Sequence, residues 1–438
     1  MNRDKSRFLY GAVLALVLLS PSARANGRFP QASLIVFQPG VPAHFLVRTT
    51  FGLLESQDAG KTFDWTCESA LGLGDQEDPM LAVTEAGVRV AATHGGIVTS
   101  AEGCNWSANT ALIGASMVDL TLDASTSGRV VALDVEAQSD GSFASQLLAS
   151  NDNGANFSVL GGTLPDGLFA LSVDVAPSDS KRVYVTARRG LTDGYVSVLL
   201  RSQDGGLSFE AQAIPNTGSQ QLAYLAAVNP TDPDRLYVRV NDASGTALWS
   251  SGDGGETLKP LLIGQGKLLG FAVSPDGQKI ALGGPADGIW VGAADGSALE
   301  QRSTFGPTCL GWSADGIYAC GSAATEFAVG RSLDEAATFE SLLNLKTFCG
   351  GSRCARQTQV GLRCAASAAV LPTQIGATCE ASGGAGPGGA GADAGQSSTQ
   401  STAGCALSAK PRHTATLLLP LLTLGAVCRR RGRQGRAR

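Results

Sequence analysis

The octet Ser56-Gln57-Asp58-Ala59-Gly60-Lys61-Thr62-Phe63 is the strongest indication of the fold, because its pattern returns along the chain. Ser-x-Asp-x-Gly-x-x-aromatic predicts a stiff hairpin turn. The serine and aspartate side chains bond amides of the turn, glycine supplies a positive φ, and the aromatic residue begins the next strand. Clear copies occupy residues 150–157 and 202–209, and weaker ones occupy 100–106, 251–258 and 332–339.

The predicted turn residues of the five better copies are Ser56, Asp58, Gly60, Phe63, Ser150, Asp152, Gly154, Phe157, Ser202, Asp204, Gly206, Phe209, Ser251, Asp253, Gly255, Ser332, Asp334 and Phe339. Successive serines, counting Ser100 of the sixth copy, lie 44, 50, 52 and 49 residues apart. The gap from Ser251 to Ser332 is 81 residues, so a decayed copy is expected between them, near Trp290 and Asp295-Gly296. Seven units of this size predict seven propeller blades.

Each unit also contains enough β-rich segments for four strands. A second turn recurs between the first two: residues 229–238 (NPTDPDRLYV) parallel residues 176–185 (APSDSKRVYV). Long helical periodicity is absent from 30 to 345, and 56 glycines among 438 residues argue against a helical bundle. The sequence therefore predicts an all-β, seven-bladed propeller of four-stranded blades over residues 26–346.

The octet resembles the Asp-box, or BNR repeat, of sialidases, sortilin-type receptors, some glycoside hydrolases and photosystem II assembly factors. The resemblance covers roughly residues 30 to 345. It implies a propeller whose Asp-boxes lie on the outer edge, away from the ligand site. The arginine triad and the other catalytic residues of sialidases have no match here, and Arg28-Phe29-Pro30 is out of order for their Phe-Arg-Ile-Pro segment. We therefore do not expect a sialidase.

The amino terminus has the pattern of a secretory signal peptide over residues 1–25. Basic residues precede an apolar run from Phe8 to Leu19, and Ala23-Arg24-Ala25 is a small-residue cleavage site. Cleavage after Ala25 predicts an exported protein. Without its two ends, the stretch 26–404 carries 21 basic and 37 acidic residues, a net charge of -16. Because such a surface repels phosphate, we expect no nucleic-acid partner.

The carboxyl terminus is organised as a linker and a tail. Residues 381–404 are almost all small or polar, which is typical of a flexible tether. Residues 405–438 then contain Cys405, an apolar stretch and a run of arginines, the order of a stop-transfer segment. This tail resembles the MYXO-CTERM sorting signals of myxobacterial surface proteins, which implies a short transmembrane segment, processing near Cys405 and attachment at the outer membrane or cell surface, or release. An ordinary single-pass tail is the alternative.

Ten cysteines in an exported chain predict disulfides. Cys309 and Cys320 flank a turn at a spacing suited to a cross-strand bridge, and Cys67 and Cys104 are expected to join the first two blades. The remaining candidates form a cluster in residues 347–380, where we expect two bridges that cap the propeller: Cys349, Cys354, Cys364 and Cys379. A zinc site is the alternative, but the cluster has no C-x-x-C pair. Cys405 and Cys428 remain unpaired.

The sequence offers no candidate catalytic, metal-binding or cofactor-binding residues. The repeated aspartates are interpreted as turn residues, and core packing accounts for all five tryptophans. His44 and His94 are too few for a metal triad, and His94 is read as a surface residue. An acidic loop with Asp75, Glu77 and Asp78 lacks the ligand spacing of a calcium site.

These observations favour a monomeric, surface-attached propeller that binds a protein or polysaccharide and touches the membrane only through its tail. The alternatives are a carbohydrate-active hydrolase with its site in the central pocket, and an assembly factor. Two facing carboxylates at the ring mouth are expected for the hydrolase. An aromatic or apolar face without them is expected for a binding protein.

Overall fold

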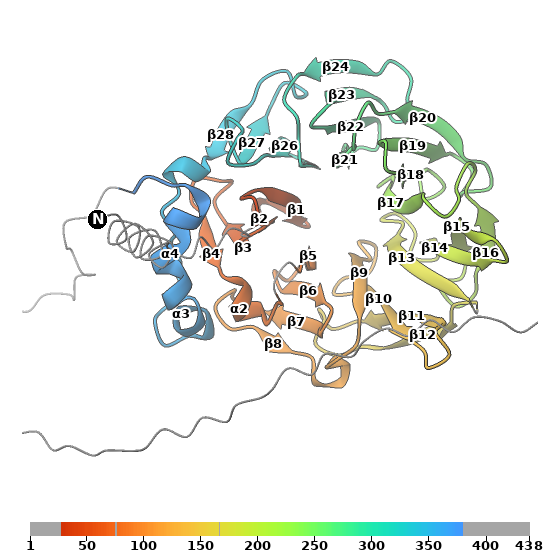
Figure 1. Ribbon diagram of the computed structural model, residues 1–438, viewed down its shortest axis with the longest axis horizontal. Coiled ribbons are helices and arrows are strands. Elements are labelled where there is room, and N and C mark those ends of the chain that lie inside the picture. Colours follow the sequence, from red (N-terminus) through yellow and green to blue (C-terminus); the bar gives the residue numbers. More distant parts are fainter. Residues whose placement is uncertain (1–27, 75–76, 166, 380–438) are drawn as a thin grey trace, which may run out of the picture. The chain divides into compact units, whose positions relative to one another are not determined.

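The computed structural model describes residues 28–74, 77–165 and 167–379. In this part of the chain, 28 strands form seven four-stranded antiparallel sheets, each made of consecutive strands. The sheets are arranged radially as blades (Figure 1). This confirms the predicted all-β, seven-bladed propeller. Ala25, the linker 381–404 and the tail with Cys405 lie outside the described residues.

Blades 1 to 4 contain β1 (Ala32–Gln38), β2 (Val41–Thr49), β3 (Gly52–Ser56), β4 (Asp64–Thr66); β5 (Met80–Val83), β6 (Arg89–Thr93), β7 (Gly96–Ser100), β8 (Ser107–Ala108); β9 (Met117–Leu122), β10 (Val130–Ala137), β11 (Phe143–Ser150), β12 (Ser158–Thr163); and β13 (Leu168–Val175), β14 (Val183–Leu191), β15 (Gly194–Ser202), β16 (Glu210–Ala213). Blades 5 to 7 contain β17 (Leu222–Val228), β18 (Leu236–Asn241), β19 (Thr246–Ser251), β20 (Lys259–Ile263); β21 (Gly270–Val273), β22 (Lys279–Gly284), β23 (Gly288–Ala293), β24 (Glu300–Ser303); and β25 (Cys309–Ser313), β26 (Gly316–Cys320), β27 (Val329–Ser332), β28 (Glu340–Leu343). The short helices are α2 (Glu68–Leu71), η1 (Thr110–Leu112), η2 (Leu345–Thr347), α3 (Gln359–Arg363) and α4 (Ala365–Ile375).

The first strand of every blade is innermost, and each contacts the first strand of the next blade (Figure 1). The circle is completed where β25 of blade 7 contacts β1 of blade 1. There the Ala32 amide donates to the Gly321 carbonyl at 2.9 Å, and Thr308 Oγ1 donates to the Ala32 carbonyl at 2.6 Å. Because each blade consists of consecutive strands, the described residues contain no strand that is exchanged between the two ends of the ring.

The repeated octets form the predicted hairpin turns between the third and fourth strands. In blade 1, Ser56 Oγ accepts from the Gly60 amide at 2.8 Å, and Asp58 accepts from the Thr62 amide at 2.9 Å. The copies at 150–157, 202–209, 251–258 and 332–339 repeat both bonds. A side chain at Gly60, where φ is +86°, would also place its Cβ 2.6 Å from Leu342, so a larger residue would be strained there. The decayed copy is present as the turn after β23.

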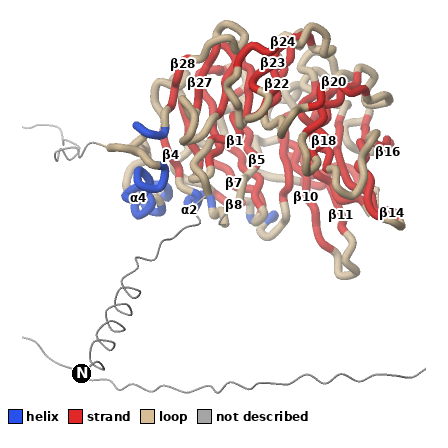
Figure 2. The backbone as a smooth tube through the Cα atoms, turned by 45° about the horizontal axis from the view of Figure 1, so that its top comes forward, coloured by secondary structure: helices blue, strands red, loops and turns tan. Residues whose placement is uncertain are grey.

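The C-terminal cap, residues 347–379 of the described chain, lies beside blades 1 and 2 (Figures 1 and 2). It contains α3 and α4 and closes on itself through Cys349–Cys379. Two further bridges, Cys67–Cys364 and Cys104–Cys354, fasten it to blades 1 and 2. The expected bridge between Cys67 and Cys104 is therefore wrong, and only one of two expected bridges inside the cap exists. Cys309–Cys320 is confirmed as a cross-strand bridge.

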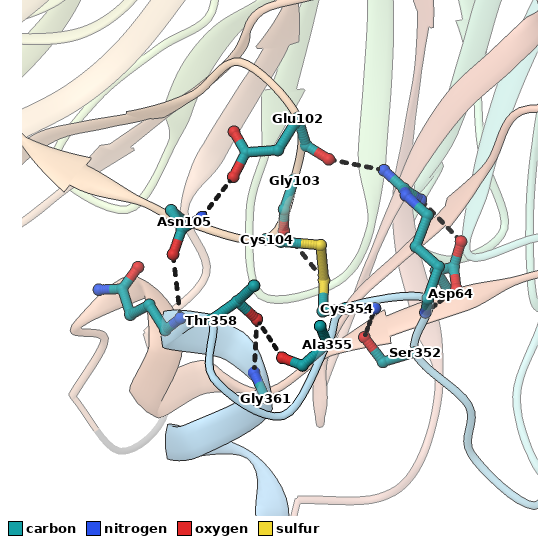
Figure 3. The surroundings of a disulfide bond; sticks show 12 residues. Asp64, Glu102, Gly103, Cys104, Asn105, Ser352, Cys354, Ala355, Thr358 and Gly361 are labelled. Atoms are coloured by element: carbon teal, nitrogen blue, oxygen red, sulfur yellow. Dashed lines mark hydrogen bonds and ion pairs between the residues drawn. A yellow bond between two sulfur atoms is a disulfide. The ribbon is translucent and has the colours of Figure 1, made fainter. Parts of the chain in front are cut away.

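Around the Cys104–Cys354 bridge, the cap contacts residues of both blades, among them Asp64 of blade 1 and Glu102 of blade 2 (Figure 3). The Trp65 amide in β4 donates to the Gly351 carbonyl at 2.7 Å, and the Val360 amide donates to the Cys104 carbonyl at 3.0 Å. Arg353 Nη1 pairs with Asp64 at 2.6 Å. These bonds protect part of the edge of β4, which would otherwise be a template for aggregation. The cap also fastens the end of blade 7 to blades 1 and 2.

Among the described residues, none of the helices combines the length and hydropathy that a membrane crossing requires. The four cysteines of the cap are all oxidised, which leaves no thiolate for the alternative zinc site. Four disulfides indicate that the chain folds in an oxidising, extracytoplasmic environment.

Candidate binding surface

A hydrolase with its site in the central channel needs two carboxylates that face each other there. On the seven inner strands, the acidic residues are Asp119 of β9 and Asp174 of β13. Asp119 accepts a hydrogen bond at 2.9 Å from the Val173 amide of the next blade. Asp174 accepts at 3.1 Å from the Val228 amide of the blade after it. Both carboxyl groups thus fasten neighbouring blades, which is a structural task.

These two carboxyl groups predict a pH dependence of stability. Burial raises the pKa of Asp119 from 3.8 to about 7 although two backbone amides oppose the rise, and burial raises the pKa of Asp174 to about 6. The pKa of each group is higher in the folded than in the unfolded protein. Their contribution to the free energy of unfolding is therefore complete below about pH 4 and is lost as the pH rises towards 7. We expect Asp119→Asn to flatten the fall in Tm between pH 4 and 7, measured by calorimetry. An unchanged slope would show that Asp119 does not titrate in that range.

The aspartates of the repeated turns are distributed one to a blade and are not brought together. In the copies of blades 3, 4, 5 and 7, hydrogen bonds from the side chain and amide of the residue four positions later lower the carboxyl pKa to about 2. The sets are Asp152 with Asn156, Asp204 with Ser208, Asp253 with Thr257, and Asp334 with Thr338. Each carboxylate is occupied by its own turn, as predicted.

Two hairpins distinguish blades 3 and 4 from the rest. β10 and β11 pair continuously from Val130–Ser150 to Ala137–Phe143, and β14 and β15 pair from Val183–Ser202 to Leu191–Gly194. In the other blades, the second strand has five to nine residues and the third strand has only four to six, so the paired part of the hairpin is shorter. The β10–β11 hairpin consequently projects beyond the neighbouring blades (Figure 2). Such projections are where a rigid scaffold usually carries its contact residues.

The outer ends of these hairpins and the neighbouring strands β13, β17 and β18 carry a group of aromatic and arginine residues, which we call the aromatic–arginine surface. Its members are Phe143, Phe169, Arg188, Tyr195, Tyr224 and Arg239. Phe143 is 40% exposed and Tyr195 is 49% exposed, and the other four are partly buried. Leu191, at the tip of the second hairpin, is 58% exposed and adds apolar area. The surface spans blades 3, 4 and 5.

Direct contacts and strand register hold this surface together. The rings of Phe143 and Phe169 meet edge to face with their centroids 4.7 Å apart. Phe169 lies opposite Arg188 in the β13–β14 register, and Arg188 lies opposite Ser197, two residues from Tyr195. Residues so placed share one face of a sheet. The guanidinium of Arg188 lies 4.3 Å from the centre of the Tyr195 ring, a cation–π contact.

Carbonyl groups of the following blade fix the two arginines. Arg188 Nη2 donates to the Ser219 carbonyl at 3.1 Å, and Arg239 Nη1 donates to the Leu269 carbonyl at 3.2 Å. Burial raises the pKa of Tyr224 although Arg239 and Arg188 act in the opposite direction. The surface is therefore pre-organised, and a partner does not have to immobilise free arginine side chains.

A buried charge cluster lies between blades 1 and 2 and the cap. Glu55 Oε1 contacts His44 Nε2 at 2.7 Å and Arg89 Nε at 3.1 Å, while its other oxygen accepts from Arg353 of the cap at 3.1 Å. Burial alone would raise the pKa of Glu55, but the bonds from His44 and Arg89 outweigh it and lower the pKa to about 2. With every partner engaged, the cluster fastens the cap rather than serving catalysis.

The remaining sequence candidates have ordinary roles. His94 is exposed, as expected, and its amide donates to Glu77 at 2.6 Å. In the acidic loop, Asp75 lies outside the described residues and Asp78 pairs with Arg28 at 2.5 Å. The described residues contain no group of three or more acidic, histidine or cysteine side chains arranged to hold a metal ion.

No family model matches the chain, and no curated protein matches it. Among solved structures, it is similar to an ancestral GH74 enzyme at 16% identity over 60% of this chain, with a TM-score of 0.45, and it spans only 36% of that enzyme's chain. It is also similar to a protein of unknown function from Dyadobacter fermentans DSM 18053 (14% identity, 61% of this chain and 92% of that one, TM-score 0.42) and to the Kuenenia stuttgartiensis hydrazine synthase (12%, 72% and 99%, TM-score 0.50). At these identities the likeness shows the propeller fold alone.

Proposed function

We propose that this chain is an exported, surface-attached binding module that contacts a protein or polysaccharide through the aromatic–arginine surface. The observation that carries the proposal is the pre-organised group around Phe143, Phe169, Arg188 and Tyr195. Tyrosine and arginine are enriched among residues that dominate binding energy. The two inner-strand carboxylates are occupied by the neighbouring blades, so no observation favours the hydrolase.

Export and attachment rest on the two termini. Four disulfides support export, and processing of the C-terminal signal near Cys405 is the proposed route to attachment. Mass spectrometry of the cell-associated protein tests this part separately. We expect the residues beyond Cys405 to be missing, and an intact Arg438 would contradict the sorting proposal.

Replacing Phe143 and Tyr195 together by alanine is expected to weaken binding of the partner about tenfold or more, because aromatic residues of this kind dominate interface energetics. The measurement is a glycan array and a pull-down from the surface of the producing cells, followed by titration of whatever is recovered. The matched control replaces Leu207 and Ile263, which are 61% and 77% exposed on other parts of blades 4 and 5.

If both double variants bind the partner equally well, the aromatic–arginine surface is not its binding site. Turnover of a glycan at enzyme-like rates would overturn the proposal itself. The wild-type Tm should persist in both variants, since all four residues are largely exposed or at strand ends.

A further inference from the structure

A hollow lies beside the hairpin turns of blades 6 and 7, far along the chain from the aromatic–arginine surface. Its larger part has a volume of about 430 Å³ and is bounded by Trp312, Asp315, Arg331 and Leu333. An adjoining part of about 340 Å³ extends to Asp276 and Lys279 of blade 6. Trp312 and Glu335 border both parts, so we call the whole hollow the Trp312 cleft. Such volumes fall within the range of about 300–1,000 Å³ for small-ligand sites.

Among the tryptophans, Trp312 combines partial exposure with an indole N–H that has no hydrogen-bond partner among the described residues. One side packs against the hydrophobic core between blades 6 and 7, but the residue is only half-buried and borders the cleft. Its indole N–H makes no hydrogen bond to any residue that the structure describes, whereas Trp65 and Trp290 donate to the carbonyls of Phe51 and Asp287. The indole N–H of Trp106 is also unbonded, but that residue is buried at 7% exposure, so its N–H is closed to a ligand. Core packing, which we expected to account for every tryptophan, therefore accounts for only part of Trp312.

The sequence also marks blade 7 at this position. Trp312-Ser313-Ala314-Asp315 forms the turn between its first two strands, and the same turn in blade 6 reads Val273-Ser274-Pro275-Asp276. In both turns the serine bonds the aspartate. Valine is enough for the turn and the core in blade 6, so the fold alone does not require an indole in blade 7.

Paired charges form the rim of the cleft. Asp315 accepts from the Tyr318 hydroxyl at 3.0 Å and lies 3.5 Å from Arg331, which also pairs with Glu340 at 3.0 Å. Lys279 pairs with Glu335 across the junction of the two blades. These fixed groups offer both donors and acceptors to hydroxyl groups. Three carboxylates and two cations line the cleft, a balance that disfavours an anionic ligand.

We propose that the Trp312 cleft binds an uncharged oligosaccharide. The indole supplies an apolar platform for the C–H face of a sugar ring and a free N–H, and the paired side chains around it hydrogen-bond the ring hydroxyls. The proposal does not depend on the aromatic–arginine surface, because the two share no residue.

The test is an NMR titration of the ¹⁵N-indole signals of the purified exported protein. The probes are three neutral hexasaccharides, of β-1,4-glucose, β-1,4-xylose and β-1,4-mannose, with polygalacturonate as the anionic comparison. One of the five indole signals, assigned to Trp312 by its loss in Trp312→Phe, is expected to shift saturably with a Kd of about 1 mM or tighter for at least one neutral sugar. Because the Trp312 variants lack this indole signal, their affinities are measured from the shifts of backbone amide signals in the same titration. Trp312→Ala should weaken binding of that sugar about tenfold, and Leu207→Ala should leave it unchanged.

Absence of any shift at about 10 mM of every neutral sugar would overturn the proposal. If polygalacturonate shifts the same signal and binds more tightly than the neutral sugars, the proposal that the ligand is uncharged is wrong. If Trp312→Ala fails to fold, Trp312→Phe keeps an aromatic platform without the N–H, and its affinity should then fall only a few-fold. Equal affinity of wild type and Trp312→Phe, together with an unshifted indole signal, would contradict a role for Trp312.

Discussion

Removing both bridges between the cap and the ring, by replacing Cys67, Cys104, Cys354 and Cys364 with serine, is expected to reduce stability by more than the two single-bridge losses added together. The bridges close chain separations of 297 and 250 residues. While one remains, the other closes a loop of only roughly 50 residues, so its loss alone should amount to about 4 kcal/mol on chain-entropy grounds. When both bridges are lost, the loop of about 250 residues between the cap and the ring is also open in the unfolded chain. The total loss in the free energy of unfolding is then about 9 kcal/mol.

Guanidinium unfolding followed by tryptophan fluorescence measures these differences, because Trp65 and Trp106 lie in the two blades that the cap covers. The matched control replaces Cys309 and Cys320, whose bridge spans 11 residues within one hairpin and should contribute about 3 kcal/mol. If the four-cysteine variant loses no more than the control, the cap is dispensable for ring closure.

Glu55→Gln is expected to lower the free energy of unfolding by about 3–5 kcal/mol, since it removes one partner from a buried ionic cluster. Glu55 is 8% exposed and Arg89 is 4% exposed, so the guanidinium is left without its carboxylate in a site that water barely reaches. The same variant should abolish part of the acid sensitivity. The wild-type pKa of about 2 lies below the unfolded value, so this stability exists above about pH 4.5 and is lost as the pH falls towards 2.

Urea unfolding at neutral pH and at pH 3 measures both effects. Glu340→Gln is the control, because Glu340 pairs with Arg331 in an exposed position and should contribute at most about 1 kcal/mol. If the two variants lose similar amounts of unfolding free energy, the buried Glu55 cluster stabilises the fold no more than an exposed ion pair does. An unchanged response to acid in Glu55→Gln would show that another carboxylate controls it.

Most of the fold is legible in the sequence because the turns are local. Ser56 and Asp58 bond amides within six residues of themselves, so their spacing along the chain equals their spacing in the hairpin. Blade count follows from the interval between such turns, and Cys309–Cys320 follows from the register of one hairpin. The missing copy near Trp290 was predictable from the doubled gap alone.

The cap and the two surfaces were not legible in this way. Cys67 and Cys104 find their partners only because ring closure returns the end of blade 7 to blades 1 and 2, which sequence spacing does not encode. The Glu55 cluster likewise joins residues from both ends of the chain. The aromatic–arginine surface had a usable signal, the unusual length of the apolar alternation around residues 130–150 and 183–202. In blade 7, the corresponding signal was the presence of Trp312 at the position that Val273 occupies in blade 6.

Mass spectrometry of peptides from the unreduced exported protein tests the central claim most directly, that a seven-bladed ring is closed by a disulfide-fastened cap. We expect two linked pairs, Cys67 with Cys364 and Cys104 with Cys354. A peptide that links Cys67 directly to Cys104, or free thiols at these four positions, would contradict it.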